Sequence, residues 1–157
     1  MSARINYMNN PLFRKYLEFS MALQDSTIDE LTRELMSLRA SQVNGCAFCV
    51  DMHVKKATLL GERPLRLHHV AIWRESALFT PRERAAFAWT ELLTTLPAHG
   101  VPDEAFAQAR EHFSEQELTD LTFAIMAING WNRISIAYAA VPGSQDKAYG
   151  LLGANLG

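Results

Sequence analysis

The sequence predicts an all-α protein, and three observations support this prediction. Three residues that can cap a helix, Thr27, Thr80 and Ser114, each stand three positions before a glutamate, a spacing typical of helix starts. No segment alternates apolar and polar residues for long enough to predict a strand. Hydrophobic residues make up 48% of the 157 positions, which is enough for one core without the support of disulfides.

The expected helices can be placed in order from these signals. Glycines 45 and 61 tolerate the left-handed conformation that ends many helices, and prolines 64 and 97 disfavour helical continuation. The expected helices cover residues 11–22, 28–43, 46–60, 65–75, 81–96, 102–112 and 115–140. The last helix is apolar nearly all round, so we expect neighbours on several sides, some of which a homo-oligomer could supply. We expect residues 1–157 to form a single domain, with a peripheral tail from about residue 142.

The charge balance excludes some classes of partner. With 15 Lys and Arg against 17 Asp and Glu, the net charge is -2, which disfavours nucleic acid or an anionic membrane as the main partner. No apolar run reaches the roughly 18 residues that a membrane span needs, and residues 1–22 lack the apolar core of a signal peptide. We therefore expect a soluble, cytoplasmic protein.

The only two cysteines, Cys46 and Cys49, form a C-x-x-C pair that opens a predicted helix. In a reducing compartment this spacing indicates redox chemistry or a metal. At 100° per residue, both cysteines share one helix face with His53, while Lys55 points elsewhere. Glu34 falls in the apolar stripe of the preceding helix, where a carboxylate needs a partner, and His53 is the candidate.

This constellation suits thiol chemistry. Residues three apart on a helix are close enough for a disulfide. Lowering a thiol pKa by about two units takes ~2.7 kcal/mol, whereas a helix N-terminus typically supplies ~0.3–1 kcal/mol. A base must therefore contribute, and His53 can take the thiol proton while Glu34 orients the ring.

Two other interpretations compete. Cys46, Cys49, His53 and Glu34 have the donor types of a four-coordinate zinc site, although structural zinc sites usually have a second C-x-x-C or a histidine pair. Alternatively, these residues are satisfied members of the core. A thioredoxin fold is disfavoured because its C-x-x-C needs a βαβ context.

The run E-x11-C-x-x-C-x3-H from Glu34 to His53, with the segment Ile128-Asn129-Gly130-Trp131-Asn132-Arg133, resembles the carboxymuconolactone decarboxylase superfamily, specifically its alkylhydroperoxidase D-like branch. The resemblance implies an all-helical subunit that forms trimers or hexamers and reduces hydroperoxides. In this family pattern Cys49 becomes the sulfenic acid, Cys46 is the proton donor and resolving thiol, and Glu34 with His53 forms the proton relay. A dithiol, which in the family can be a lipoylated protein, reopens the disulfide. The resemblance implies no metal, flavin or nicotinamide.

Several points stay open at this level. Phe48 stands where the family's best-known peroxidase has a histidine, and Cys46 lies nearer the helix start although the family assigns attack to Cys49. One alternative function is decarboxylation of a lactone acid through Glu34 and His53, and another is redox sensing without turnover. Asn129 and Asn132, amides in an apolar helix, need hydrogen-bond partners or line the thiol pocket. The three tryptophans are expected in the core or an interface, and the paired histidines 68 and 69 at the surface or in packing.

Overall fold

The protein, described by a computed structural model for residues 3–156, consists of helices joined by short connections, and those residues contain no β-strand. The prediction of an all-α fold is confirmed. Seven α-helices follow one another in the order α1 (Pro11–Ala22), α2 (Glu30–Asn44), α3 (Ala47–Leu59), α4 (Pro64–His69), α5 (Pro81–Thr95), α6 (Asp103–Arg110) and α7 (Glu115–Ala137). Short 3-10 helices cover Tyr7–Asn9, Leu23–Asp25, Val70–Glu75 and Leu152–Ala154.

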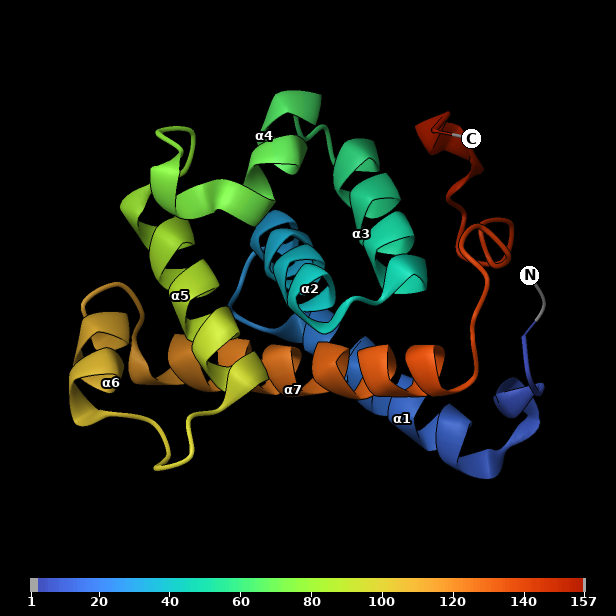
Figure 1. Ribbon diagram of the computed structural model, residues 1–157, viewed down its shortest axis with the longest axis horizontal. Helices are drawn as coiled ribbons and strands as arrows, with labels where there is room; N and C mark the ends of the chain where they lie inside the picture. Colours follow the sequence, from blue (N-terminus) through green and yellow to red (C-terminus); the bar gives the residue numbers. More distant parts are fainter. Residues whose placement is uncertain (1–2, 157) are drawn as a thin grey trace.

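Helix α2 occupies the centre of the molecule and packs against α3, α5 and α7 (Figure 1). Its surroundings explain why Leu35, Met36 and Leu38 are almost completely buried although they point to different sides of the helix. Helix α7 runs along one edge of the molecule, with α1 beside it. A polar side chain on the side of α2 that faces α3 therefore lies in the interior.

Helix starts follow local chemistry at two of the three predicted capping boxes. The hydroxyls of Thr80 and Ser114 each accept a hydrogen bond from the backbone N–H three residues later. The glutamate at that position accepts one from the backbone N–H of the capping residue. The prediction at Thr27 was wrong, because its N–H and hydroxyl both donate to Asp120 of α7, each over 2.8 Å. Helix α2 instead begins at Glu30, with Asp29 as its cap.

The helix predicted over residues 65–75 is two elements. Helix α4 ends at His69, and a 3-10 segment follows in which Ile72 has the non-helical angles φ -120° and ψ 30°. The predicted glycine stops are confirmed, since Gly45 and Gly61 have φ of 70° and 88°.

The chain after α7 returns along α3, so its two ends lie on the same side of the molecule (Figure 1). Over residues 3–156, no helix is long and apolar enough to cross a membrane. The single-domain assignment for residues 1–157 stays a prediction.

Candidate active site

The C-x-x-C pair lies at a sharp junction between α2 and α3. Gly45 adopts the left-handed conformation at the end of α2, and its N–H bonds back to the carbonyls of Gln42 and Ser41. Cys46 follows in an extended conformation as the N-cap of α3, and its own N–H donates to the Ser41 carbonyl over 2.9 Å. The glycine turn therefore places the C-x-x-C pair at the start of α3, as predicted.

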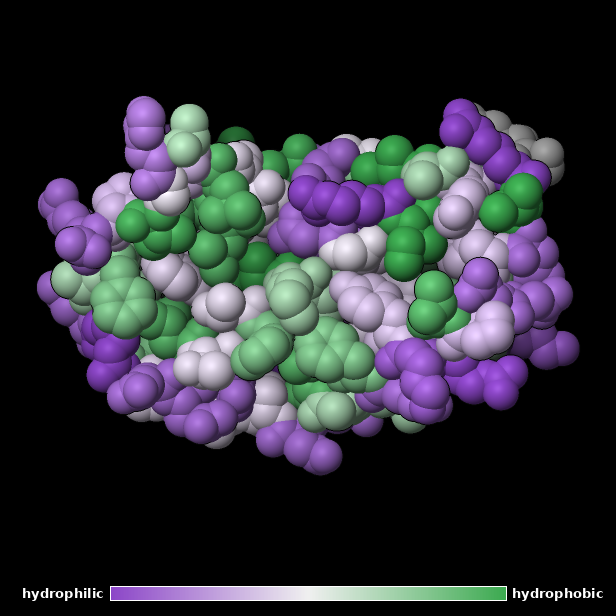
Figure 2. Space-filling model, turned by 90° about the horizontal axis from the view of Figure 1, so that it is seen from below, coloured by the Kyte–Doolittle hydropathy of each residue, from purple (hydrophilic) through white to green (hydrophobic). Residues whose placement is uncertain are grey.

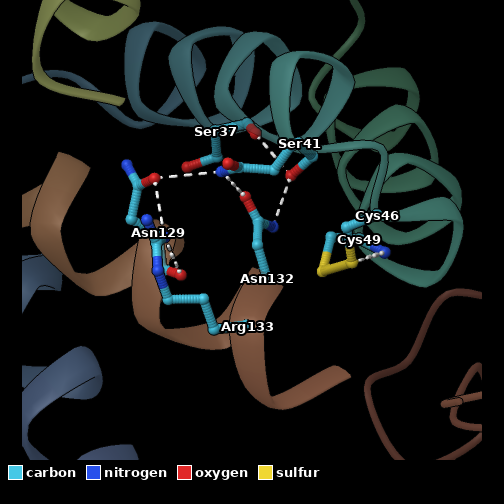
Figure 3. The surroundings of a disulfide bond; sticks show 8 residues. Ser37, Ser41, Cys46, Cys49, Asn129, Asn132 and Arg133 are labelled. Atoms are coloured by element: carbon cyan, nitrogen blue, oxygen red, sulfur yellow. Dashed lines mark hydrogen bonds between the residues drawn. A yellow bond between two sulfur atoms is a disulfide. The ribbon is translucent and has the colours of Figure 1, made fainter. Parts of the chain in front are cut away.

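Cys46 and Cys49 are joined by a disulfide, with their Cα atoms 5.3 Å apart (Figure 3). That separation lies within the range that disulfides tolerate. The Cys49 N–H donates to the Cys46 sulfur over 3.3 Å, so the sulfur takes the place of an N-cap side-chain oxygen. In the reduced protein the same amide would favour a thiolate at Cys46.

Glu34 and His53 form a buried pair beside this junction, as expected from the cost of burying a lone carboxylate. The Nδ1 atom of His53 lies 2.6 Å from Oε2 of Glu34, and both residues are less than 10% exposed. Burial alone would raise the pKa of Glu34. The charge and hydrogen bond of His53, helped by Lys56 and Arg33, hold that pKa below its ordinary value.

This pairing fixes the chemical role that the imidazole can play. An ionised Glu34 only accepts hydrogen bonds, so Nδ1 of His53 must carry the hydrogen. In the neutral ring the lone pair is then on Nε2, a buried atom that has no hydrogen-bond partner within residues 3–156. A protonatable nitrogen without a partner, one helical turn from Cys49, can accept a thiol proton.

A cavity of about 620 Å³ reaches this group of residues. Its wall includes Cys49, His53 and Glu34, but Cys46 is absent from the residues that line it. Most of the remaining lining is apolar, with Phe13, Leu17, Met52, Ile128 and Trp131 among its members. Both cysteines are only 1% exposed, and of the two it is Cys49 that borders the cavity.

The asparagines of α7 bind α2 and stand apart from the cavity. Asn132, which is fully buried, donates to the Ser41 hydroxyl over 3.0 Å and accepts from the Asn44 amide over 2.8 Å (Figure 3). The Asn44 amide also donates to Asn129 over 2.9 Å, and Asn129 donates to Thr94 over 3.0 Å. Of the two roles left open for these amides, the structure shows the first, because they hold the end of α2 immediately before Cys46.

Other predicted positions divide between packing and cavity. Trp73 and Trp89 pack in the core, with indole N–H groups bonded to Glu91 and Thr122, whereas Trp131 lines the cavity. Lys55 leaves the cysteine face but is only 3% exposed, because Asp51 and Asp146 enclose its ammonium group.

Sequence reasoning missed several polar residues of the cavity wall, among them Tyr7, Lys56 and Tyr149. Lys56 carried a usable signal, because it lies three residues after His53 on the same helix, a spacing that makes two side chains neighbours. Its ammonium group is 3.7 Å from Oε1 of Glu34. The two tyrosines carried none, since they lie outside the α-helices, near opposite ends of the chain.

Comparison with known proteins identifies the family of this chain. The model of the carboxymuconolactone decarboxylase family matches residues 10–92. The chain belongs to this family. The uncharacterized protein YdfG of Bacillus subtilis is 41% identical over 139 residues, which cover 87% of this chain and 95% of YdfG. The uncharacterized protein YnjA of Escherichia coli is 36% identical over 100 residues, covering 64% of this chain and 54% of YnjA.

Solved structures support the alkylhydroperoxidase D-like branch of the carboxymuconolactone decarboxylase family. A protein of unknown function from Agrobacterium tumefaciens, described as a candidate antioxidant defence protein AhpD, has a TM-score of 0.86 and 38% identity, covering 90% of this chain and 98% of its own. The debrominase Bmp8 shares the fold, with a TM-score of 0.77 at 20% identity over 89% of this chain and 75% of Bmp8.

This family member departs from the expected pattern at Phe48. The side chain is 9% exposed and contributes to the cavity wall. A phenyl ring there supplies apolar surface and no proton, so Glu34 and His53, which are hydrogen-bonded to each other in the cavity wall, remain as the acid–base pair.

Proposed function

We propose that the protein is a thiol-dependent peroxidase that reduces organic hydroperoxides through Cys49 and Cys46. One observation carries the proposal: Cys49 and His53 both line the cavity, Nδ1 of His53 is held by Glu34 while its Nε2 has no hydrogen-bond partner within residues 3–156, and Cys46 is bonded to Cys49. The thiol that attacks the peroxide, the base that moves the proton and the thiol that resolves the sulfenic acid are therefore present together.

The first step is attack by the Cys49 thiolate on the distal oxygen of the hydroperoxide. The Cys49 proton passes to Nε2 of His53, the O–O bond breaks, and the alkoxide that leaves takes the proton back from His53 as an alcohol. Cys49 becomes a sulfenic acid, oxidised by two electrons. Glu34 stabilises the imidazolium that forms between these transfers.

The second step closes the disulfide seen in the structure. The Cys46 sulfur attacks the Cys49 sulfenic acid, and the hydroxyl leaves as water with the Cys46 proton. A dithiol then reduces the disulfide by exchange and is itself oxidised. We include a lipoylated protein among the candidate reductants, and a cytoplasmic location, in which the cysteines return to thiols, in the same proposal.

The assembly forms part of this proposal. Large apolar side chains stay exposed on α1 and α7, including Leu12, Met21, Phe123 and Met126. The face seen from below shows hydrophobic residues gathered over its middle (Figure 2). A homo-oligomer, a trimer or a hexamer, would cover such a surface, and light scattering on the purified protein measures its mass.

The decisive experiment is a count of free thiols after reduced, metal-free protein has been treated with a small excess of cumene hydroperoxide. We expect rapid loss of both thiols, with a Cys46–Cys49 disulfide in the digest. Cys49→Ser should keep its remaining thiol, and Cys46→Ser should accumulate a sulfenic acid that an alkylating dimedone probe traps. Thiols that stay inert in the wild type would refute the proposal.

Two further assays separate the alternatives. Decarboxylation of a lactone acid through Glu34 and His53 predicts activity that survives loss of both cysteines. Redox sensing predicts stoichiometric oxidation without steady turnover, whichever dithiol is supplied.

A further inference from the structure

The two ends of the described chain contribute to the wall of the active-site cavity. Tyr7 comes from the 3-10 helix before α1, and Tyr149 and Leu151 come from the segment after α7. The C-terminal end of the chain runs beside α3, the helix that carries the cysteines (Figure 1). The cavity is thus closed on this side by segments outside the α-helical core.

A buried ion cluster fixes the C-terminal segment in this position. The Lys55 ammonium group lies 2.7 Å from Asp146 of the segment and 3.0 Å from Asp51 of its own helix. The Gly143 N–H donates to the same Asp51 carboxylate over 3.1 Å, and Leu151 is only 3% exposed. Three anchors therefore hold the chain on both sides of Tyr149, so the phenol has a defined place in the wall.

The two phenol groups face the same region. Tyr7 is held by stacking on Tyr138, with ring centroids 5.3 Å apart, and by an edge contact with Phe13. Burial raises the pKa of Tyr149, and the neighbouring Tyr7 raises it further, which keeps the Tyr149 hydroxyl protonated as a donor at neutral pH. Within residues 3–156, no protein group is hydrogen-bonded to either hydroxyl.

The size and chemistry of the cavity indicate what these donors meet. A volume of about 620 Å³ is typical of sites that bind an organic molecule of tens of atoms, whereas hydrogen peroxide would leave most of it unfilled. Apolar rings and aliphatic chains line the space, and in such sites a few polar groups set orientation. The free phenols are suited to that role.

We propose that Tyr7 and Tyr149 are substrate-binding residues, and that the cavity accepts amphipathic hydroperoxides with an apolar body and a hydrogen-bond-accepting oxygen group remote from the peroxide. This inference rests on the proposed peroxidase function and names its substrate class. The peroxide meets Cys49, the body lies against Trp131 and Met52, and the oxygen group accepts from the phenols.

Three hydroperoxides test the inference: linoleic acid hydroperoxide, which has both features, cumene hydroperoxide, which lacks the remote oxygen group, and hydrogen peroxide, which lacks both. We expect the highest kcat/KM for the linoleic acid hydroperoxide. Tyr149→Phe and Tyr7→Phe should each lower that value by about threefold to tenfold, the effect of one hydrogen bond, through KM. Values for the two other peroxides should change less than about twofold. Tyr138→Phe, which removes a hydroxyl beside the cavity but outside its wall, is the matched control.

A second measurement keeps the inference separate from the peroxidase proposal. Binding of 13-hydroxyoctadecadienoic acid, the alcohol product, to Cys49→Ser is measured by calorimetry and needs no turnover. Weaker binding in Cys49→Ser/Tyr149→Phe supports the inference even if no peroxide is reduced. Equal binding with and without the phenols, or equal loss of kcat/KM for all three peroxides, overturns it. Reduced thiols that survive every peroxide would instead refute the proposed function.

Discussion

Replacement of Asn132 by Leu should destabilise the protein by about 2 kcal/mol. The change removes two hydrogen bonds, to the Ser41 hydroxyl and from the Asn44 amide, and a buried hydrogen bond contributes about 0.5–1.5 kcal/mol. Neither partner is left completely unpaired, since Ser41 still donates to the Ser37 carbonyl over 2.7 Å and Asn44 still donates to Asn129 over 2.9 Å. The loss should therefore stay below the larger penalty of a buried, fully unsatisfied group.

Urea unfolding under reducing conditions measures this loss without the constraint of the disulfide. A double-mutant cycle with Asn44→Ala isolates the contact between the two amides, for which we expect a coupling energy of about 1 kcal/mol. A loss smaller than about 0.5 kcal/mol for Asn132→Leu, or strictly additive effects of the two changes, would show that the network does not hold the end of α2.

Three further predictions follow from packing, charge and pH. Gly130→Ala should lower the melting temperature although alanine favours helices by about 1 kcal/mol, because the new methyl group would clash with the Tyr16 ring; Gly130→Ala in a Tyr16→Ala background should recover most of the loss. Lys55→Met should cost about 3 kcal/mol in urea unfolding, since it leaves two carboxylates facing each other; adding Asp146→Asn should restore part of this, and full stability in the single variant would argue against the ion cluster. The pKa of Glu34 is lowered in the folded state from its ordinary value of 4.5, so its contribution to stability is present above that value and is lost as the pH falls through the lower, folded pKa. The difference in unfolding free energy between wild type and Glu34→Gln should therefore shrink on acidification below 4.5, and a difference that stays constant there would contradict the assignment.

Features governed by neighbouring residues were predictable from the sequence. The helix starts at Thr80 and Ser114 depend on residues three positions away, and the Gly45 junction needs only a residue that tolerates positive φ. The Glu34–His53 pair was also predictable. Helical periodicity placed Glu34 in an apolar stripe, and burying a carboxylate there without a partner is energetically unfavourable.

Features governed by distant contacts were not predictable in this way. Thr27 does not cap α2 because it donates to Asp120, 93 residues away in sequence. The place of Tyr149 in the cavity wall depends on the bond between Lys55 and Asp146, which are 91 residues apart. Local periodicity predicts neither contact, so the path of the chain after α7 could be seen only in the structure.

The position of the disulfide has a kinetic consequence within the proposed cycle. Since Cys49 lines the cavity and Cys46 does not, we expect oxidant and reductant to reach Cys49 through the same entrance. The two cannot be bound there together, so the enzyme should alternate between half-reactions and give parallel double-reciprocal plots. Each substrate at high concentration should also inhibit competitively against the other, which ties the rate of peroxide removal to the local ratio of peroxide to reduced dithiol.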